Sequence, residues 1–405
     1  MKNTDYDVVV VGAGPVGSTA ARYAVNNGAT VLMIEDHASI GSPVGCTGLL
    51  STRALSECEV LPSDSFVLNK VRGAFVYPMS GACLPIDGKE TKAYVVSRKN
   101  FDRTLASMAL DSGVELKLNT RATGLDNIDG VQKLSIIENG QPGEIRAKVV
   151  IGADGVRSRV ARMAGLGQVK KILPGIQIEA PYKSPDVDYV ELFVGSQAPG
   201  FFGWTVPVNE NISRIGLAID CRADENVRTY LDRMLKNNDH IASRYEGGHL
   251  DLVIGGIPLG PPDKTYAEGT LITGDAAGQV KPTSGGGIYT GVACARIAGE
   301  VAARAALEED NSAQRLAEYD CRWRAKIGRE LAIGMNIHNF IGGRSDSEMD
   351  ELIASMNKPP ILDTITTYGD MDHPSIVIKK LLRPSNSRHL LGVFRAFAKT
   401  VLWHS

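Results

Sequence analysis

The sequence lacks the features that mark disulfide-rich, metal-binding or membrane-spanning proteins. Its six cysteines are scattered and form no C-x-x-C pair, which excludes a zinc ribbon or a thioredoxin-like motif and fits a reducing compartment. No apolar run approaches the roughly 18–20 residues that span a bilayer, and a short polar start followed by a strand is not typical of a signal peptide. We therefore expect a cytoplasmic protein, or one held peripherally on the inner face of the cell membrane, without a metal site.

The chain also carries little net charge of either sign. Its 44 Lys and Arg residues face 46 Asp and Glu residues, which gives a formal net charge of −2. Such a chain has no overall field that would attract nucleic acid, and nucleic acid is not expected as a partner. With 405 residues it is long enough for two or three structural units, and no internal repeat divides it.

What the sequence does contain is a βαβ unit at its start. Residues 6–11 predict a buried parallel strand, because four consecutive valines show no polar alternation. A glycine-rich turn follows, then a helix at 14–27 and a second strand at 30–35. Later, residues 174–261 change to period-two strands, and a long helix is expected at 287–308.

These patterns predict an α/β fold in which a Rossmann-type domain is interrupted by an antiparallel sheet. Beyond residue 312 the chain is expected to be mainly helical, with a capping box at 345–348 opening one helix. The expected units are a discontinuous Rossmann-type domain (1–70, 97–165 and 265–311), an inserted antiparallel-sheet domain (71–96 and 166–264) and a helical C-terminal region (312–405).

The turn of the βαβ unit has the spacing of a dinucleotide-binding loop. Gly12, Gly14 and Gly17 form G-x-G-x-x-G directly after the strand, with Pro15 opening the helix. The first glycine permits the tight turn, the second lets the backbone approach a pyrophosphate, and the third allows close helix packing. Glu35, at the end of the second strand, is placed to accept hydrogen bonds from ribose hydroxyls. A turn that merely needs glycine would not account for this terminal acid.

Three further segments resemble the para-hydroxybenzoate hydroxylase-like flavoprotein superfamily. They are VIGADGVRS at 150–158, TGDAAG at 273–278 and PTSGGGI at 282–288. The resemblance implies FAD, with Asp154 among the cofactor-binding residues and Asp275 on a ribityl hydroxyl. It also places the backbone of Gly287 and Ile288 at the pyrimidine edge of the flavin, where helix N-terminal amides stabilise the negative charge of the reduced ring.

The sequence has no second G-x-G-x-x-G, and so no separate NADPH domain of the glutathione-reductase kind is expected. An external electron donor must then reach the flavin transiently. Both NAD(P)H and a reduced ferredoxin-like protein are candidates, and no sequence motif indicates a binding site for either donor.

Two segments resemble the geranylgeranyl reductase family, and specifically its archaeal ether-lipid branch. They are PVGCTGLLS at 43–51 and PGFFGWTVP at 199–207, and the similarity spans about residues 1–340. The family pattern P-x-x-Y-x-W-x-F-P keeps its tryptophan and both prolines here, but has Phe202 for Tyr and Val206 for Phe. Loss of the tyrosine hydroxyl removes one hydrogen bond or proton donor and leaves an aromatic wall.

The resemblance implies an FAD-dependent reductase that saturates isolated C=C bonds of a geranylgeranylated lipid. It assigns cofactor contacts to four residues around the flavin and to one backbone position at the adenosine end, and it assigns the substrate wall to the second segment. The cofactor residues are Gly45, Cys46, Gly48, Arg98 and Ala122, and the substrate residues are Phe202, Trp204 and Pro207.

An isolated alkene has no carbonyl to polarise it, and hydride addition from reduced flavin therefore needs a proton donor. Cys46 is the candidate, because a thiol is protonated at neutral pH and tolerates an apolar wall. The alternative that Cys46 is a small packing residue stays open. So do a surface salt bridge for Arg98 and a simple core for the aromatics of 201–204.

Two rival functions and one tail hypothesis remain. The same scaffold serves flavin monooxygenases, which need O₂, and prenyl-lipid carriers resembling GDP-dissociation inhibitors, which do no redox work. In the tail, Leu390, Phe394, Phe397 and Val401 follow helical spacing beside basic residues. That pattern fits either a helix lying on an anionic membrane or a terminal helix docked on the core.

Overall fold

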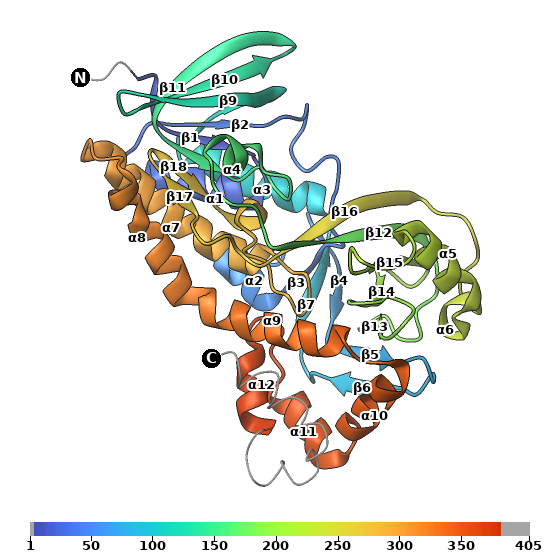
Figure 1. Ribbon diagram of the computed structural model, residues 1–405. Coiled ribbons are helices and arrows are strands. Elements are labelled where there is room, and N and C mark those ends of the chain that lie inside the picture. The colour runs from blue at the N-terminus through green and yellow to red at the C-terminus, as the bar shows by residue number, and fades with distance from the viewer. Residues whose placement is uncertain (1–3, 382–405) are drawn as a thin grey trace.

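The computed structural model describes residues 4–381, and the tail pattern from Leu390 to Val401 lies outside them. The chain forms two parts, each built on a sheet, with helices of the C-terminal region running across both (Figure 1). The fold confirms the expected architecture of a Rossmann-type domain, an inserted sheet and a helical C-terminal region. Among the described residues, no helix is long and apolar enough to cross a bilayer.

The first sheet has parallel strands at its centre. Strands β18, β11, β1, β2 and β8 run parallel, β17 pairs antiparallel at one edge, and β9 and β10 extend β11 as an antiparallel layer. The bounds are β1 (Tyr6–Val11), β2 (Val31–Ile34), β8 (Glu115–Lys117), β9 (Thr120–Ile128), β10 (Val131–Glu138), β11 (Gln141–Gly152), β17 (Tyr266–Ala267) and β18 (Thr270–Ile272).

The valine run of β1 is buried on both faces, as its lack of alternation predicts. Val8 and Val10 face a layer of helices that includes α1 (Pro15–Asn26) and α7 (Ile288–Leu307). Val9 and Val11 face the other side, where β9, β10 and α4 (Arg159–Met163) cover the sheet. Helix α3 (Arg98–Asp111) packs beside α1 in the helix layer (Figure 1). Because β1 and β2 are parallel, the loops at their carboxyl ends lie at the same edge of the sheet.

The second sheet is mixed rather than purely antiparallel. Its order is β16-β12-β15-β14-β13-β5-β6, and every pair is antiparallel except β13 with β5. The pattern within each strand could not reveal this, because β5 comes from a much earlier segment. The bounds are β5 (Gly73–Tyr77), β6 (Leu84–Asp87), β12 (Lys171–Pro181), β13 (Tyr189–Phe193), β14 (Gly203–Pro207), β15 (Ile212–Ala218) and β16 (Asp251–Leu259).

One face of this sheet is closed by α5 (Val227–Asn237) and α6 (Asp239–Ala242). On that side the buried carboxylate of Glu191 accepts hydrogen bonds from Tyr182, Thr205 and Arg244. All its partners are protein groups, so this carboxylate has a structural role. The opposite face of the sheet is the one that borders the cavity described below.

A small third sheet divides the segment that we assigned whole to the inserted domain. Strands β5 and β6 join the second sheet, but β7 (Ala93–Val96) pairs with β3 (Leu49–Ser51) and β4 (Val67–Val71). Helix α2 (Thr52–Glu57) follows β3 directly. The domain limits themselves stay a prediction.

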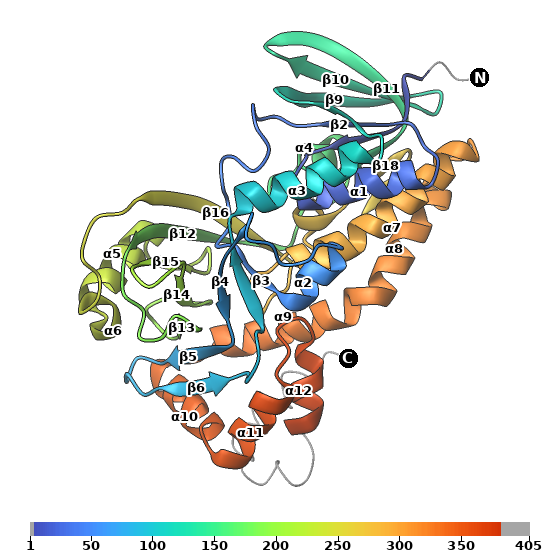
Figure 2. The same ribbon diagram turned by 180° about the vertical axis from the view of Figure 1, so that it is seen from behind.

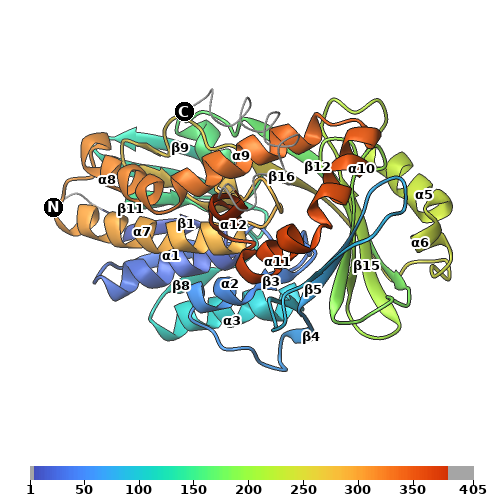
Figure 3. The ribbon, with the colours of Figure 1, turned by 90° about the horizontal axis from the view of Figure 1, so that it is seen from below.

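The C-terminal region is helical, as expected, and bridges the two parts. It comprises α8 (Ala313–Trp323), the π-helical turn η2 (Arg324–Gly328), α9 (Arg329–Gly342), α10 (Asp346–Met356), α11 (Pro359–Tyr368) and α12 (Pro374–Leu381). The expected capping box forms between Ser345 and Glu348 at the start of α10. Helices α10 and α11 pack on β6 (Figure 2), and α11 and α12 lie where the two parts meet (Figure 3).

Candidate functional site

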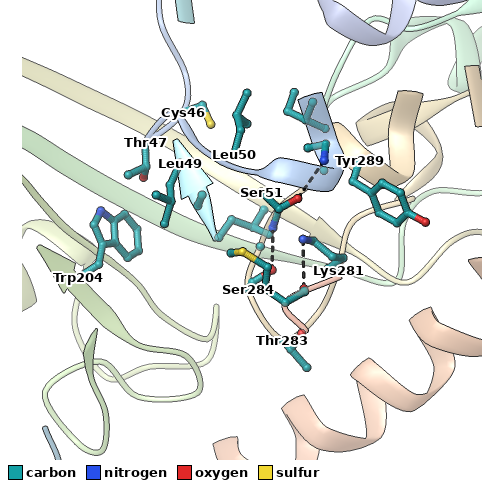
Figure 4. A pocket seen from close by; sticks show the side chains of 18 of the residues that line it. Cys46, Thr47, Leu49, Leu50, Ser51, Trp204, Lys281, Thr283, Ser284 and Tyr289 are labelled. Carbon is teal, nitrogen blue, oxygen red and sulfur yellow. Dashed lines mark hydrogen bonds between the residues drawn. The ribbon is translucent and has the colours of Figure 1, made fainter. Parts of the chain in front are cut away.

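A cavity of about 1130 Å³ lies where the first sheet, the second sheet and the C-terminal helices meet. Small-ligand sites commonly measure about 300–1,000 Å³, so this one has room for an unusually large ligand. Figure 4 shows Cys46, Leu49 and Trp204 on one side of it and Lys281, Thr283 and Tyr289 on the other. Toward the second sheet and the C-terminal helices the wall is largely aliphatic, with Ala74, Ile86, Val190, Leu192, Val206, Ile337, Ile341, Ile365 and Val377.

The glycine loop after β1 is closely packed on its protein side and bare on its cavity side. A Cβ on Gly17 would lie 1.8 Å from the carbonyl oxygen of Gly12, and one on Gly12 would lie 2.4 Å from that of Ala153. A Cβ on Gly14 would meet nothing within 4 Å, and Gly14 and Pro15 border the cavity. The N-terminus of α1 is therefore open to a ligand, as pyrophosphate binding requires.

Glu35 lies at the end of β2, as expected, and braces the glycine loop. One carboxylate oxygen accepts from the Ala13 N–H at 2.9 Å, and the other is 2.6 Å from His37 Nδ1. Neither Glu35 nor the buried Ala122 of β9 belongs to the cavity wall. Their contacts with the ribose and the adenosine end stay predictions.

The structure gives Asp154 a role in capping α4. One of its oxygens accepts from Ser158 Oγ at 2.6 Å, and the other accepts from the N–H groups of Arg159 and Val160. The neighbouring Gly155 borders the cavity, and a Cβ there would meet nothing within 4 Å. The geometry thus favours the backbone at Gly155 over the Asp154 side chain as the ligand contact.

Asp275, which follows β18 in the turn η1 (Gly274–Ala277), presents its carboxylate to the cavity. Burial raises its pKa, and the positive charge of Arg98 opposes that rise. Within residues 4–381 no group donates a hydrogen bond to this carboxylate. A Cβ on Gly287 would lie 2.7 Å from Asp275 Oδ1, so glycine is needed there to leave the carboxylate room. An unpartnered acceptor beside a bare backbone fits a polyhydroxylated ligand such as the ribityl chain of FAD.

Cys46 and Arg98 lie together on the cavity wall. Arg98 pairs with Asp102 through two hydrogen bonds of 2.9 and 3.0 Å, and the Cys46 thiol is a further partner. Although burial lowers the pKa of Arg98, its interactions with Asp102 and Cys46 outweigh that effect and raise it. The Arg98 side chain is 14% exposed, which excludes the surface salt bridge as its description.

The cysteine loop is held from the second sheet by Arg214 of β15, which the sequence did not single out. Its guanidinium donates to the carbonyl oxygens of Thr47 at 2.6 Å and Val96 at 3.0 Å. Gly48 turns the chain with φ +76° and donates its N–H to Cys46 Sγ at 3.3 Å. Gly45 borders the cavity with nothing within 4 Å of a Cβ position, whereas Gly48 lies behind the wall.

The aromatic segment of 201–204 forms part of the wall, as expected. Phe202 stacks on Phe201 with centroids 4.1 Å apart and meets Trp204 edge-on at 6.1 Å. Trp204 Nε1 donates to Gln177 at 3.0 Å. Pro207 does not belong to the cavity wall, because successive residues of a strand point to opposite faces and Val206 lines the cavity instead. Substrate contact by Pro207 stays a prediction.

The C-terminal helices contribute wall residues that no motif indicated. Ile337, His338 and Ile341 come from α9, Ile365 from α11 and Val377 from α12. Spacing of four residues between Ile337 and Ile341 could have identified a buried face of a helix, but not what that face borders.

His338 provides a test of this buried wall through pH. It is 5% exposed, and burial, with help from Lys171 and against Asp220, lowers its pKa to about 4. Between pH 6.5 and about 4 the unfolded chain binds a proton here that the folded chain does not, so stability falls as pH falls. This one group changes the free energy of unfolding by about 1.4 kcal/mol per pH unit. Urea unfolding measured across this pH range should therefore show a dependence on pH that is weaker by about that amount in His338→Gln than in the wild type. The same pH dependence in both proteins would contradict the assignment.

The fold and the site together are those of an FAD-dependent oxidoreductase. The family model described as FAD dependent oxidoreductase matches residues 7–249. The digeranylgeranylglycerophospholipid reductase of Methanocaldococcus jannaschii is 36% identical over 88% of this chain and 92% of its own length. That of Methanothrix thermoacetophila is 35% identical over 88% and 92%.

A solved structure gives the same result for the fold. The geranylgeranyl bacteriochlorophyll reductase-like protein of Thermoplasma acidophilum superposes with a TM-score of 0.84 at 29% identity, covering 96% of this chain and 99% of its own. The chain belongs to the digeranylgeranylglycerophospholipid reductase family of FAD-dependent oxidoreductases. Its cofactor is FAD, and the family and cofactor expected from the sequence are confirmed.

Proposed function

We propose that this protein is an FAD-dependent reductase that saturates isolated C=C bonds in the geranylgeranyl chains of archaeal-type ether phospholipids. The observation that carries the proposal is the aliphatic and aromatic wall that continues from the flavin-binding loops into the space between β13, β14 and the C-terminal helices. A prenyl chain has no polar group, and it is bound by burying its surface against such walls. The names of the curated relatives give the same substrate class.

Reduced FAD supplies the hydride, and the protein must supply the proton. Cys46 borders the cavity, and we assign it the role of proton donor. Arg98 already contacts the Cys46 sulfur, and its positive charge offsets the negative charge that forms there when the proton leaves. Asp102 in turn fixes the guanidinium by two hydrogen bonds, so that Arg98 acts from one position. The proton is then restored to Cys46 from solvent between turnovers.

The proposal extends to two partners. Electrons come from an external donor, NAD(P)H or a reduced ferredoxin-like protein. The one dinucleotide-binding loop among the described residues is assigned to FAD, so the donor has no domain of its own there. The lipid substrate resides in a bilayer, and peripheral contact with the inner face of the membrane would give access to it. Co-sedimentation with anionic liposomes, compared with a chain ending before Ser385, tests that contact.

Mass spectrometry of the lipid product tests the reaction itself. The purified protein is reduced with dithionite under anaerobic conditions and incubated with unsaturated archaeal ether phospholipid. We expect the lipid mass to rise by that of H₂ for each double bond reduced. A monooxygenase would leave the lipid unchanged without O₂, and a prenyl-lipid carrier would purify colourless, so either result would reject the proposal.

A further inference from the structure

A buried ion pair joins the loop before α7 to the C-terminal helices. Lys281 Nζ lies 2.5 Å from Asp372 Oδ1 and donates to the Met371 carbonyl oxygen at 3.2 Å. The two side chains are 9% and 2% exposed, and both residues border the cavity. Lys281 is seen in the cavity wall beside Thr283 and Ser284 (Figure 4). Neither partner is used by the reaction described above.

The ammonium group lies on the glycine run that opens α7. A Cβ on Gly286 would be 3.0 Å from Lys281 Cε and 3.3 Å from its Nζ. The loop closes on itself, because the Lys281 N–H donates to the Gly286 carbonyl oxygen and the Gly285 N–H donates to the carbonyl oxygen of Lys281. This positive charge is therefore fixed next to the backbone that would face the pyrimidine edge of a bound flavin. A charge held in a partly desolvated site acts strongly on its neighbours.

The negative partner is held just as firmly, by a turn between α11 and α12. Asp370 accepts hydrogen bonds from the N–H groups of Asp372 and His373 at 2.8 and 3.0 Å, which fixes the backbone at Asp372. Arg53 of α2 pairs with Asp370 at 2.7 Å and reaches Asp372 at 3.8 Å. The C-terminal helices thus deliver a carboxylate to a cation of the flavin loop.

We propose that the charges of Lys281 and Asp372 set the reduction potential of the bound flavin. Reduction places negative charge at the pyrimidine edge, so the Lys281 ammonium favours the reduced cofactor and Asp372 limits that effect. The inference rests on the proposed placement of FAD in the cavity. It gives the C-terminal helices a second role beside lining the substrate tunnel, because they carry the counter-charge.

Removing the two charges one at a time gives opposite predictions. On FAD-loaded protein titrated against a reference dye, Lys281→Met should lower the potential and Asp372→Asn should raise it. We expect each shift to change the ratio of oxidised to reduced flavin at least tenfold, or about 30 mV for a two-electron couple. The double variant, which removes both charges, should return to within a few-fold of the wild-type ratio.

A purely mechanical link between the two elements predicts something else. Both single variants break the same contact, so they would then shift the potential in one direction or not at all, and either result overturns the inference. Lys281→Arg keeps the charge and should keep the potential. Lys326→Met is the matched control, since Lys326 pairs with Glu57 at 2.8 Å outside the cavity wall and should leave the potential unchanged.

The experiment also separates this inference from the proposed function. A wild-type protein that binds no FAD, or that fails to reduce the lipid, counts against the function. A protein that binds FAD and reduces the lipid, but whose two variants do not shift in opposite directions, counts against the inference alone.

Discussion

Replacing Gly14 by Asp is expected to give a folded protein that no longer binds FAD. Gly14 precedes α1 with φ −70°, and a Cβ there meets nothing within 4 Å, so the apoprotein accommodates the side chain. Aspartate is also a favoured residue at a helix N-cap. Its carboxylate, however, enters the space that the pyrophosphate needs and repels it. Titration of the apoprotein with FAD should show an affinity at least ~100-fold lower, or about 2.8 kcal/mol.

Gly17→Ala is the informative comparison. Its Cβ would lie 1.8 Å from the Gly12 carbonyl oxygen, so the loop must move and the folded state should lose stability as well as FAD. Thermal unfolding of the two apoproteins distinguishes the roles, since Gly14→Asp should match the wild type and Gly17→Ala should unfold at lower temperature. Retention of wild-type FAD affinity by Gly14→Asp would contradict the placement of the pyrophosphate at α1.

The sequence predicts well those parts of the protein whose structure is determined by residues within one short segment. The valine run of β1 is buried on both faces and the sequence shows it without reference to any other segment. Gly12, Gly14 and Gly17 act within a single turn, and the spacing gives each its place. The capping box at Ser345 and Glu348 is equally local.

The parts that sequence misses depend on partners far apart along the chain. Arg214 donates a hydrogen bond to the carbonyl oxygen of Thr47, 167 residues away, and the sequence around neither residue indicates that contact. Asp372 and Lys281 meet only because the C-terminal helices fold back over the loop before α7. The parallel pairing of β13 with β5 likewise needs the whole chain. The FAD half of the site is therefore legible from motifs, whereas much of the substrate half is assembled from residues that individually look like ordinary core.

Asp154 illustrates an intermediate case. The motif located a turn that does border the cavity, but the side chain caps α4 and the bare backbone at Gly155 faces the open space. A motif identifies the backbone conformation that a ligand needs more reliably than it identifies which atom touches the ligand.

The proton-donor assignment makes the second large prediction. Cys46→Ser is expected to slow alkene reduction by roughly 10²–10⁴-fold, the usual contribution of a positioned general acid. A hydroxyl is a much weaker acid than a thiol, and Arg98 then faces a group that does not readily give up its proton. Reduction of the flavin by dithionite should be unchanged. The rate of lipid reduction in single turnovers of the pre-reduced protein is the measurement to make.

Cys221→Ser is the control, because Cys221 is exposed and lies outside the cavity wall, and this variant should retain the wild-type rate. If Cys46→Ser also kept that rate, Cys46 would be a packing residue and the proton would have to come from elsewhere. The stacked rings of Phe201 and Phe202 offer no substitute, because neither side chain carries an acidic hydrogen. In the proposed mechanism, the proton that this apolar part of the wall does not supply comes from the thiol of the loop that Arg214 and Gly48 hold at the edge of the cavity.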